Sequence, residues 1–301
     1  MRVGLYAGAR RMIPWKRIGV ALKSGQAGVE PLLRRIAAVV SNHGLELVLE
    51  REAAVRLPGL DSGGGLALEK VAARSDLLIV LGGDGTVLAA VRAVGERDVP
   101  ILGINLGHLG FLADLAPENV DAALAAVFGG EYGVLERSRL AVTCVNEGRD
   151  VNTDLVLNDA VITKGSALAR LIELEACVDE KVIATYRSDG LILSTPTGST
   201  AYNLSAGGPL VDSTVPAIII NPICPHTLTQ RPLVLPDSLQ VEVRLRSPEE
   251  ATLTLDGQVG TSLHPGDAVR VTRSAHPVRF VIALEHDRFE TLRKKLGWGS
   301  L

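Results

Sequence analysis

The chain has little of several features that mark other classes of protein. Aromatic residues make up only 3% of its 301 residues, so a hydrophobic core must be built mainly from Leu, Val, Ile and Ala. Cysteine occurs only three times, at widely separated positions, which argues against a secreted domain held together by disulfides. No apolar run approaches the roughly 18 residues of a membrane helix, and the N-terminus does not resemble a signal peptide. We therefore expect a cytoplasmic protein without a membrane partner.

Positive charge is also scarce relative to negative charge. The 31 Lys and Arg residues are outnumbered by 34 Asp and Glu residues, so we expect no nucleic-acid partner. Disorder is disfavoured as well, because 47% of the residues are hydrophobic and the net charge is only −3. Glycine, in contrast, is abundant. The chain has 31 glycines, about 10% of its 301 residues, whereas average usage is roughly 7%. This surplus suggests tight turns or a close approach of the backbone to a ligand.

The first 130 residues alternate strand patterns with helical ones. The uninterrupted apolar run LLIVL is typical of a strand buried inside a parallel sheet. Strands that alternate with helices predict an α/β domain over residues 1–130, whose first 15 residues form an irregular extension. We expect strands at 17–22, 45–49, 77–81 and 99–104, and helices at 29–43, 69–74, 86–96 and 116–128.

The pattern changes near residue 131 to short strands separated by turns. This pattern predicts an all-β domain of the sandwich type over residues 131–283. Within the remaining segment, 284–301, Phe289, Leu292 and Leu296 share one helical face, and we expect this segment to return to the first domain. The expected strands are 139–146, 150–163, 170–178, 181–188, 191–195, 216–221, 239–246, 251–256, 268–273 and 278–283.

The short motif LGGDGT at 81–86 joins a predicted strand to a predicted helix. Ligands of open α/β sheets bind beyond the carboxyl ends of the strands, and a glycine turn before a helix favours phosphate. Asp84 would repel a phosphate unless it binds a cation or accepts a proton, a combination that suits phosphoryl transfer. The alternative is an ordinary connection in which Asp84 caps the helix. The motif is neither a P-loop nor G-x-G-x-x-G.

A second segment, 188–209, runs from a strand into a loop that is dense in hydroxyls and glycines. Its sequence is SDGLILSTPTGSTAYNLSAGGP, and it carries Tyr202, one of only four tyrosines. Hydroxyls and exposed amides can hydrogen-bond a polar ligand, while Tyr202 offers a ring face and a hydroxyl. A turn-rich connection is the alternative, but the density of polar groups favours a binding site.

Three shorter features are more ambiguous. LNDA at 157–160 places an amide and a carboxylate inside a predicted strand, where both are rare, so either a ligand contact or a bulge explains it. His108 follows the strand at 99–104, but a lone histidine is more often structural than ligand-binding. The Cys-Pro-His sequence at 224–226 has no further ligands at zinc spacing, so we expect no metal-ligating residues there.

Taken together, these segments resemble the NAD kinase family (ATP- or polyphosphate-NAD kinases). GGDGT alone is shared with phosphofructokinases and with diacylglycerol and sphingosine kinases, whereas the stretch STPTGSTAYN is specific to NAD kinases. The matching pieces occur in the family's order: GGDGT at 82–86, GHLGF at 107–111, LNDA at 157–160, DGLILSTPTGSTAYNLSAGGPL at 189–210, NPICPHTL at 221–228 and DGQ at 256–258.

The resemblance implies an α/β nucleotide domain followed by a β-sandwich that carries much of the NAD site. It also implies an enzyme that transfers the terminal phosphoryl of ATP to the 2′-hydroxyl of the adenosine ribose of NAD, giving NADP. The small-molecule substrates are then ATP and NAD, and a homodimer or homotetramer is expected. A divalent cation, most simply Mg²⁺, would be held mainly by the ATP phosphates.

Individual roles carry over onto the matching positions of this sequence. Asp84 matches the catalytic aspartate, whose carboxylate can accept the proton of a ribose hydroxyl. The family often has Asn-Glu where this chain has Asn158-Asp159, so the shorter side chain needs a closer ribose or a bridging water. The implied phosphate turn comprises Gly82, Gly83, Gly85 and Thr86. The implied NAD-binding residues are Phe111, Asn158, Asp159, Asp189, Thr197, Thr200, Ala201, Tyr202, Ser205 and Asp256.

Three other functions are alternatives to NAD kinase activity. A lipid or sugar kinase that shares GGDGT would lack the STPTGSTAYN loop, and a lipid kinase would need an apolar patch facing the membrane. A non-catalytic dinucleotide sensor would have no need of Asp84 beside an intact glycine turn. A structural scaffold would leave the whole 189–210 segment unexplained.

Overall fold

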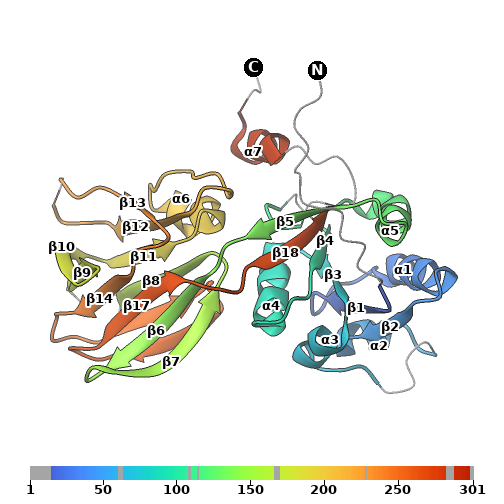
Figure 1. Cartoon of the computed structure of the whole chain (residues 1–301), viewed down its shortest axis with the longest axis horizontal. Helices are drawn as coiled ribbons and strands as arrows, with labels where there is room; N and C mark the ends of the chain where they lie inside the picture. The colour runs from blue at the N-terminus through green and yellow to red at the C-terminus, as the bar shows by residue number, and fades with distance from the viewer. Residues whose placement is uncertain are drawn as a thin grey trace. The chain divides into compact units, whose positions relative to one another are not determined.

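A computed structural model describes residues 15–59, 64–107, 110–113, 115–165, 170–227, 229–282 and 288–298. The chain divides into two compact units (Figure 1). Unit 1 comprises Met1–Glu136 and Val278–Leu301, and unit 2 comprises Arg137–Pro277. The extension expected over residues 1–15 lies outside the described residues except for Trp15, which is buried. No helix of the described part of the chain is long and apolar enough to cross a membrane.

Unit 1 is built on one six-stranded sheet with the order β2-β1-β3-β4-β18-β5. The pairings of β1 with β2 and β3, of β3 with β4, and of β4 with β18 are all parallel. The strands are β1 (Arg17–Leu22), β2 (Glu46–Leu49), β3 (Leu77–Gly82), β4 (Ile101–Asn105), β5 (Gly133–Arg137) and β18 (Val278–Ile282). The helices are α1 (Glu30–Asn42), α2 (Arg51–Arg56), α3 (Leu68–Arg74), α4 (Asp84–Val94), α5 (Val120–Phe128), α7 (Arg288–Leu296) and the 3₁₀ turn η1 (Pro117–Asn119).

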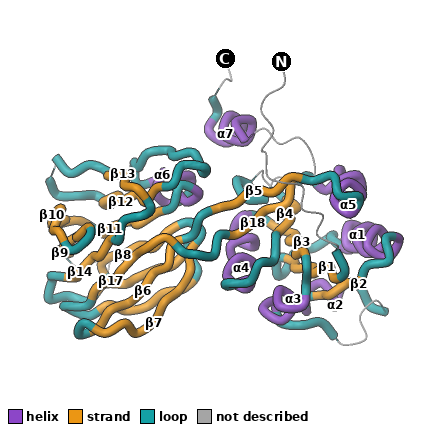
Figure 2. Tube along the Cα trace, in the orientation of Figure 1, coloured by secondary structure: helices purple, strands orange, loops and turns teal. Residues whose placement is uncertain are grey.

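Helices cover both faces of this sheet (Figure 2). Leu33 and Ile36 of α1 and Leu124 of α5 pack with the alternate strand residues that point to one face. On the other face, α3 lies so close to β1 that a Cβ on Gly19 would collide with Ser75, Val71 and Leu78. The expected α/β domain with a parallel sheet is therefore confirmed.

Unit 2 consists of two six-stranded antiparallel sheets, with the orders β10-β9-β14-β17-β6-β7 and β13-β12-β11-β8-β15-β16. The first sheet contains β6 (Leu140–Asn146), β7 (Arg149–Val156), β9 (Ile172–Val178), β10 (Lys181–Ser188), β14 (Val241–Leu245) and β17 (Ala268–Arg273). The second contains β8 (Asp159–Lys164), β11 (Gly190–Ser194), β12 (Ala217–Ile223), β13 (Leu233–Pro236), β15 (Ala251–Leu255) and β16 (Val259–Leu263). One apolar core draws on both sheets, which confirms the expected sandwich.

Some elements differ from the sequence-based expectation. The strand expected at 150–163 is two strands, β7 and β8, because residues 157–158 turn away from the ladder. Strands β13 and β16 were missed because most of their residues are exposed and show no alternation. Helix α2 was missed because it has only six residues.

The strand expected at 278–283 is β18, and it pairs with β4 of the first sheet rather than with strands of unit 2. Figure 1 shows this late segment beside β4, far from it in the sequence. Phe280 pairs in parallel with Ile101, and Val278, Phe280 and Val281 of β18 are buried. The division into domains at residues 1–130, 131–283 and 284–301 stays a prediction about where independently folding parts begin and end.

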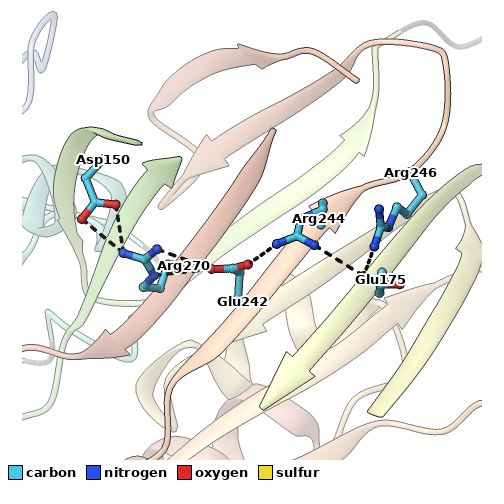
Figure 3. Close-up of polar contacts among 6 residues, drawn as sticks. All are labelled: Asp150, Glu175, Glu242, Arg244, Arg246 and Arg270. Atoms are coloured by element: carbon cyan, nitrogen blue, oxygen red, sulfur yellow. Dashed lines mark hydrogen bonds and ion pairs between the residues drawn. The ribbon is translucent and has the colours of Figure 1, made fainter. Parts of the chain in front are cut away.

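The outer face of the first sheet of unit 2 carries a row of alternating charges (Figure 3). Arg270 lies 2.9 Å from Asp150 and 3.5 Å from Glu242, and Glu242 lies 2.9 Å from Arg244. Glu175 continues the row toward Arg246, at 2.5 Å. Opposite charges on neighbouring strands stabilise cross-strand pairs and keep this face hydrated while the inner face packs the core.

Removing one charge from this row should lower the stability of the fold only slightly, and high salt should suppress the difference. We expect Glu242→Gln to lower the free energy of unfolding by no more than ~1 kcal/mol, because partly exposed ion pairs are screened. Leu253→Ala, on the inner face of β15, should cost ~2–5 kcal/mol because it opens a cavity. Urea denaturation at low and high NaCl measures both. A large Glu242→Gln effect that persists in high salt would contradict this account of the row.

Candidate active site

The glycine turn lies where β3 ends and α4 begins, at the carboxyl edge of the unit 1 sheet. Gly82 is required by packing, because a Cβ there would collide with the side chain of Thr86. Within the described part of the chain, no atom outside the chain neighbours and the helix itself lies within 4 Å of the Cβ position of Gly83 or Gly85, so a side chain there would meet no obstacle. The turn is closed by the N–H of Thr86, which donates to the carbonyl of Gly83 at 3.0 Å. This leaves a short backbone surface open at the positive end of a helix.

Asp84 is the first residue of α4, and its carboxylate binds a distant loop. The N–H of Phe111 donates to Oδ2 at 3.0 Å, and the N–H groups of Leu112 and Ala113 donate to Oδ1 at 2.9 and 3.4 Å. A Cβ on Gly110 would collide with Asp84, so only glycine allows this approach. The helix-capping alternative is wrong, because the carboxylate accepts these bonds from residues 111–113.

Phe111 connects this loop to the C-terminal helix. The Lys295 ammonium of α7 lies 5.3 Å from the centroid of the Phe111 ring, within the range of a cation–π contact. The predicted apolar face of α7 is only partly buried. Phe289 is 50% exposed and Leu292 and Leu296 are half-buried, whereas Thr291 is buried. His108 lies outside the described residues.

In unit 2, a sharp turn at Leu157-Asn158-Asp159 is held by Asp256. Its carboxylate accepts the N–H groups of Leu157, Asn158 and Asp159 at 2.9, 2.7 and 3.1 Å. Asp256 has a positive φ of 49°, and its own N–H donates to the carbonyl of Asp159 at 2.9 Å. Asp256 was expected among the NAD contacts, and the structure shows that its carboxylate is occupied with this turn.

The same turn is clamped from the other side by the start of the hydroxyl-rich loop. The Thr195 hydroxyl donates to the carbonyl of Leu157 at 2.6 Å, and the Thr195 N–H donates to the carbonyl of Asn158 at 2.8 Å. Gly198 packs against Asn158 so closely that a Cβ would collide with its carbonyl. The two motifs LNDA and STPTG therefore form one cluster, although about 40 residues separate them.

Asp159 is the buried acid of this cluster, with only 4% of its surface exposed. Burial, and secondarily the neighbouring Asp256 carboxylate, raise the pKa of Asp159 to about 7. A buried carboxyl group whose pKa is raised by burial and a neighbouring charge is a candidate functional residue.

The loop over 197–208 is built on buried amides. It contains η2 (Thr197–Thr200) and α6 (Tyr202–Ser205), and the fully buried Asn203 donates to the carbonyls of Ser199 and Pro209 at 3.2 and 3.0 Å. Asn221, from the centre of β12, donates to the side chain of Asn203 at 3.1 Å. A Cβ on Gly208 would collide with both amides. Asn221 had no predicted role, yet an amide within the apolar run IIINPI demands a buried partner and signals this one.

The predicted ligand contacts of this loop lie around that support. Tyr202 is 45% exposed and Ser205 is exposed, so both present polar groups outward. The Thr197 hydroxyl is buried and has no hydrogen-bond partner within the described part of the chain. Thr200 donates to the carbonyl of Thr197 at 3.2 Å, and Ala201 stands at the start of α6.

Asp189 lies apart from this cluster. It precedes β11, whose register pairs Gly190 with Thr163 and Ser194 with Asp159, so Asp189 and Asp159 stand at opposite ends of the strand pair. Its carboxylate forms an ion pair with Lys164 at 2.7 Å. The structure therefore does not bring Asp189 to the 157–159 turn.

Comparison with known proteins identifies the family. The ATP-NAD kinase N-terminal domain matches residues 63–132, and the ATP-NAD kinase C-terminal domain matches residues 157–283. The chain belongs to the NAD kinase family. An NAD kinase of Geobacter sulfurreducens is 44% identical over 286 residues, covering 95% of this chain and 99% of that one. An NAD kinase of Geobacter metallireducens is 51% identical over 238 residues, covering 78% and 83% of the two chains.

Solved NAD kinase structures share the fold. Yeast NADH kinase complexed with NADH superposes with a TM-score of 0.84 at 27% identity, over 96% of this chain and 90% of that one. An NAD kinase from Archaeoglobus fulgidus in complex with ATP has a TM-score of 0.73 at 27% identity, over 94% and 99%. These matches confirm three expectations: the resemblance to the NAD kinase family, the two-part fold, and the class of enzyme, which is a phosphotransferase.

The buried Asp159 predicts a pH dependence of stability. Below pH 7 the folded chain keeps the Asp159 proton, whereas the unfolded chain loses it near the ordinary value of 3.8. Unfolding therefore releases a proton between about pH 4 and 7, and the free energy of unfolding falls as the pH rises, by up to ~1.4 kcal/mol per unit. Asp159→Asn should remove this slope. The free energy of unfolding of the variant, measured by urea denaturation, should therefore rise relative to that of the wild type from pH 5 to pH 7.5. Parallel pH profiles for the two proteins would contradict the raised pKa.

Proposed function

We propose that this chain transfers the terminal phosphoryl group of ATP to the 2′-hydroxyl of the adenosine ribose of NAD, giving NADP. The observation that carries the proposal is Asp84, a carboxylate oriented by three backbone N–H groups at the open glycine turn. A non-catalytic sensor would need no proton acceptor at a phosphate turn. A lipid kinase has no use for the 197–205 loop.

In the proposed reaction, the ribose 2′-oxygen forms a bond to the terminal phosphorus while the bond to the bridging oxygen of ADP breaks. The proton of the hydroxyl passes to Asp84. Hydrogen bonds from residues 111–113 fix the direction of the carboxylate, so it need not reorganise when the proton arrives. Gly82, Gly83, Gly85 and Thr86 would receive the phosphates, because backbone N–H groups and the N-terminus of α4 favour anions.

The NAD site is proposed to use the polar cluster of unit 2. Asn158 and Asp159 would hold the adenosine, with the ribose approaching close enough for the short Asp159 side chain. Thr197, Thr200, Ala201, Tyr202 and Ser205 would line the rest, and the unpartnered Thr197 hydroxyl supports a ligand contact. Phe111 and Asp189 remain proposed dinucleotide contacts, and Asp256 supports the site by holding the 157–159 turn.

A divalent cation, Mg²⁺, is proposed to enter with ATP. Among the described residues, no group of three or more His, Cys, Asp or Glu side chains is arranged to hold a metal ion. This agrees with the habit of Mg²⁺, which keeps several waters and is bound by substrate phosphates with one or two carboxylates. Asp84 is the carboxylate at the turn that could contribute. When bound, the cation neutralises charge on the phosphates.

The cysteines and the sheet edges bear on the compartment and the oligomeric state of the enzyme. Three free cysteines suit a reducing cytoplasm. A homodimer or homotetramer is supported by apolar side chains on the sheet edges of unit 2, where Val182 of β10 is 60% exposed and Val234 of β13 is 44% exposed. A second copy of the chain would cover them.

The decisive experiment incubates the purified chain with NAD, ATP and MgCl₂ and measures NADP with an NADP-specific dehydrogenase. Wild type should form NADP, and Asp84→Asn should lose at least about a hundredfold in kcat, because the proton acceptor is gone. Asp76→Asn is a matched control, since Asp76 accepts the N–H groups of Lys16 and Arg17 at the opposite edge of the sheet. It should keep its activity. Absence of NADP from wild type with any donor and metal would refute the function.

Tyr202 should act on NAD and not on ATP. We expect Tyr202→Ala to raise the KM for NAD about tenfold, because stacking and a hydroxyl contact are lost together, with the KM for ATP nearly unchanged. Tyr202→Phe keeps the ring and should lie between the two. Steady-state kinetics in which each substrate is varied separates these effects, and a change confined to ATP would remove Tyr202 from the NAD site.

A further inference from the structure

The glycine turn of unit 1 raises a question of charge. Phosphoryl transfer depends on neutralising the negative charge of the phosphates, and P-loop enzymes and protein kinases both place a lysine there. The sequence GGDGT carries no basic residue and adds the carboxylate of Asp84. A cation supplied by the protein must therefore come from outside the motif, and the strands beside β3 are the nearest part of the sheet.

The parallel register of the sheet identifies that strand. β1 lies beside β3, and Leu22 is paired with Leu81, the residue before the glycine turn. The N–H of Lys23 then donates to the carbonyl of Leu81 at 2.9 Å. Lys23 is thus the first residue beyond β1, level with Gly82, and neighbouring strands lie only about 4.8 Å apart. A lysine stem of four carbons spans that separation.

The Lys23 side chain is available for a ligand. It is exposed, and it forms no ion pair with any other described residue. The nearest acids along the sheet edge have other partners. Glu50 accepts the N–H of Leu22 at 3.2 Å, and Glu52 accepts the hydroxyl of Ser24 at 3.3 Å. Lys23 therefore brings an exposed positive charge to the edge where Asp84 lies.

We propose that Lys23 binds the phosphates of ATP at the glycine turn. This role rests on the proposed function of the chain and adds a residue from outside the GGDGT motif to it. The ammonium supplies the charge that the turn itself lacks, while the backbone N–H groups of the turn supply direction. Lys23 is thus a substrate-binding residue for the donor and has no part in binding NAD.

The test compares the two lysines that flank β1, Lys16 and Lys23. Lys23→Met keeps the stem and removes the charge, and we expect the KM for ATP to rise about tenfold or more, the usual effect of losing a charged hydrogen bond. The KM for NAD should change less than about twofold. Lys16→Met is the matched control, because Lys16 is exposed at the opposite end of β1. Lys23→Arg should restore most of the affinity for ATP.

Calorimetric titration of each variant with ATP and Mg²⁺, without NAD, gives a second measurement independent of turnover. Weakened ATP binding in Lys23→Met but not in Lys16→Met supports the role. An active wild type whose Lys23→Met variant keeps its KM for ATP and its affinity would overturn this proposal alone. An inactive wild type that still binds ATP through Lys23 would instead overturn the proposed function. Circular dichroism spectra of the variants must match wild type, and Lys23→Arg serves where Lys23→Met fails to fold.

Discussion

The functional surfaces of both units depend on one kind of interaction, a carboxylate that gathers three consecutive backbone N–H groups from a distant loop. Asp84 does this for residues 111–113, and Asp256 does it for residues 157–159. Residues 111–113 and 157–158 lie outside the strands, so their N–H groups have no ladder partner of the kind that a strand supplies. The carboxylates replace the missing ladder bonds with charge-assisted ones, which are stronger and fix direction. Irregular backbone can therefore be held as firmly as a strand.

Glycine is what lets these loops come so close. Gly110 borders Asp84, Gly198 borders the carbonyl of Asn158, and Gly208 borders the amides of Asn203 and Asn221. At each place the obstacle to a side chain is a neighbouring polar atom rather than backbone strain, because none of the three has a positive φ. These three glycines thus reflect tight polar packing between segments that are remote along the chain. Polar groups packed this tightly give the sites little freedom to relax.

Local pattern predicted most of the architecture and part of the candidate sites. Strands β1 and β3 and helix α1 were visible because their apolar residues repeat with one clear period. The split of 150–163 into β7 and β8 was hidden because it depends on Asp256, about 100 residues later. Asp84, Asn158 and Tyr202 were visible as motif residues, whereas Lys23 and Asn221 gain their significance only from strand pairing. Pairing between distant strands is the information that a single sequence carries most weakly.

The pairing of β18 with β4 bears on the order in which the protein is made. Unit 2 is one continuous stretch, Arg137–Pro277, whereas the unit 1 sheet needs Val278–Ile282 to complete the order β4-β18-β5. During synthesis from the N-terminus, every strand of unit 2 leaves the ribosome before β18 does. Leu115 bridges Ile104 early, but Ile101 must wait for its partner Phe280 while 172 residues between β4 and β18 are added, from Leu106 to Pro277. Unit 1 begins first and is finished last.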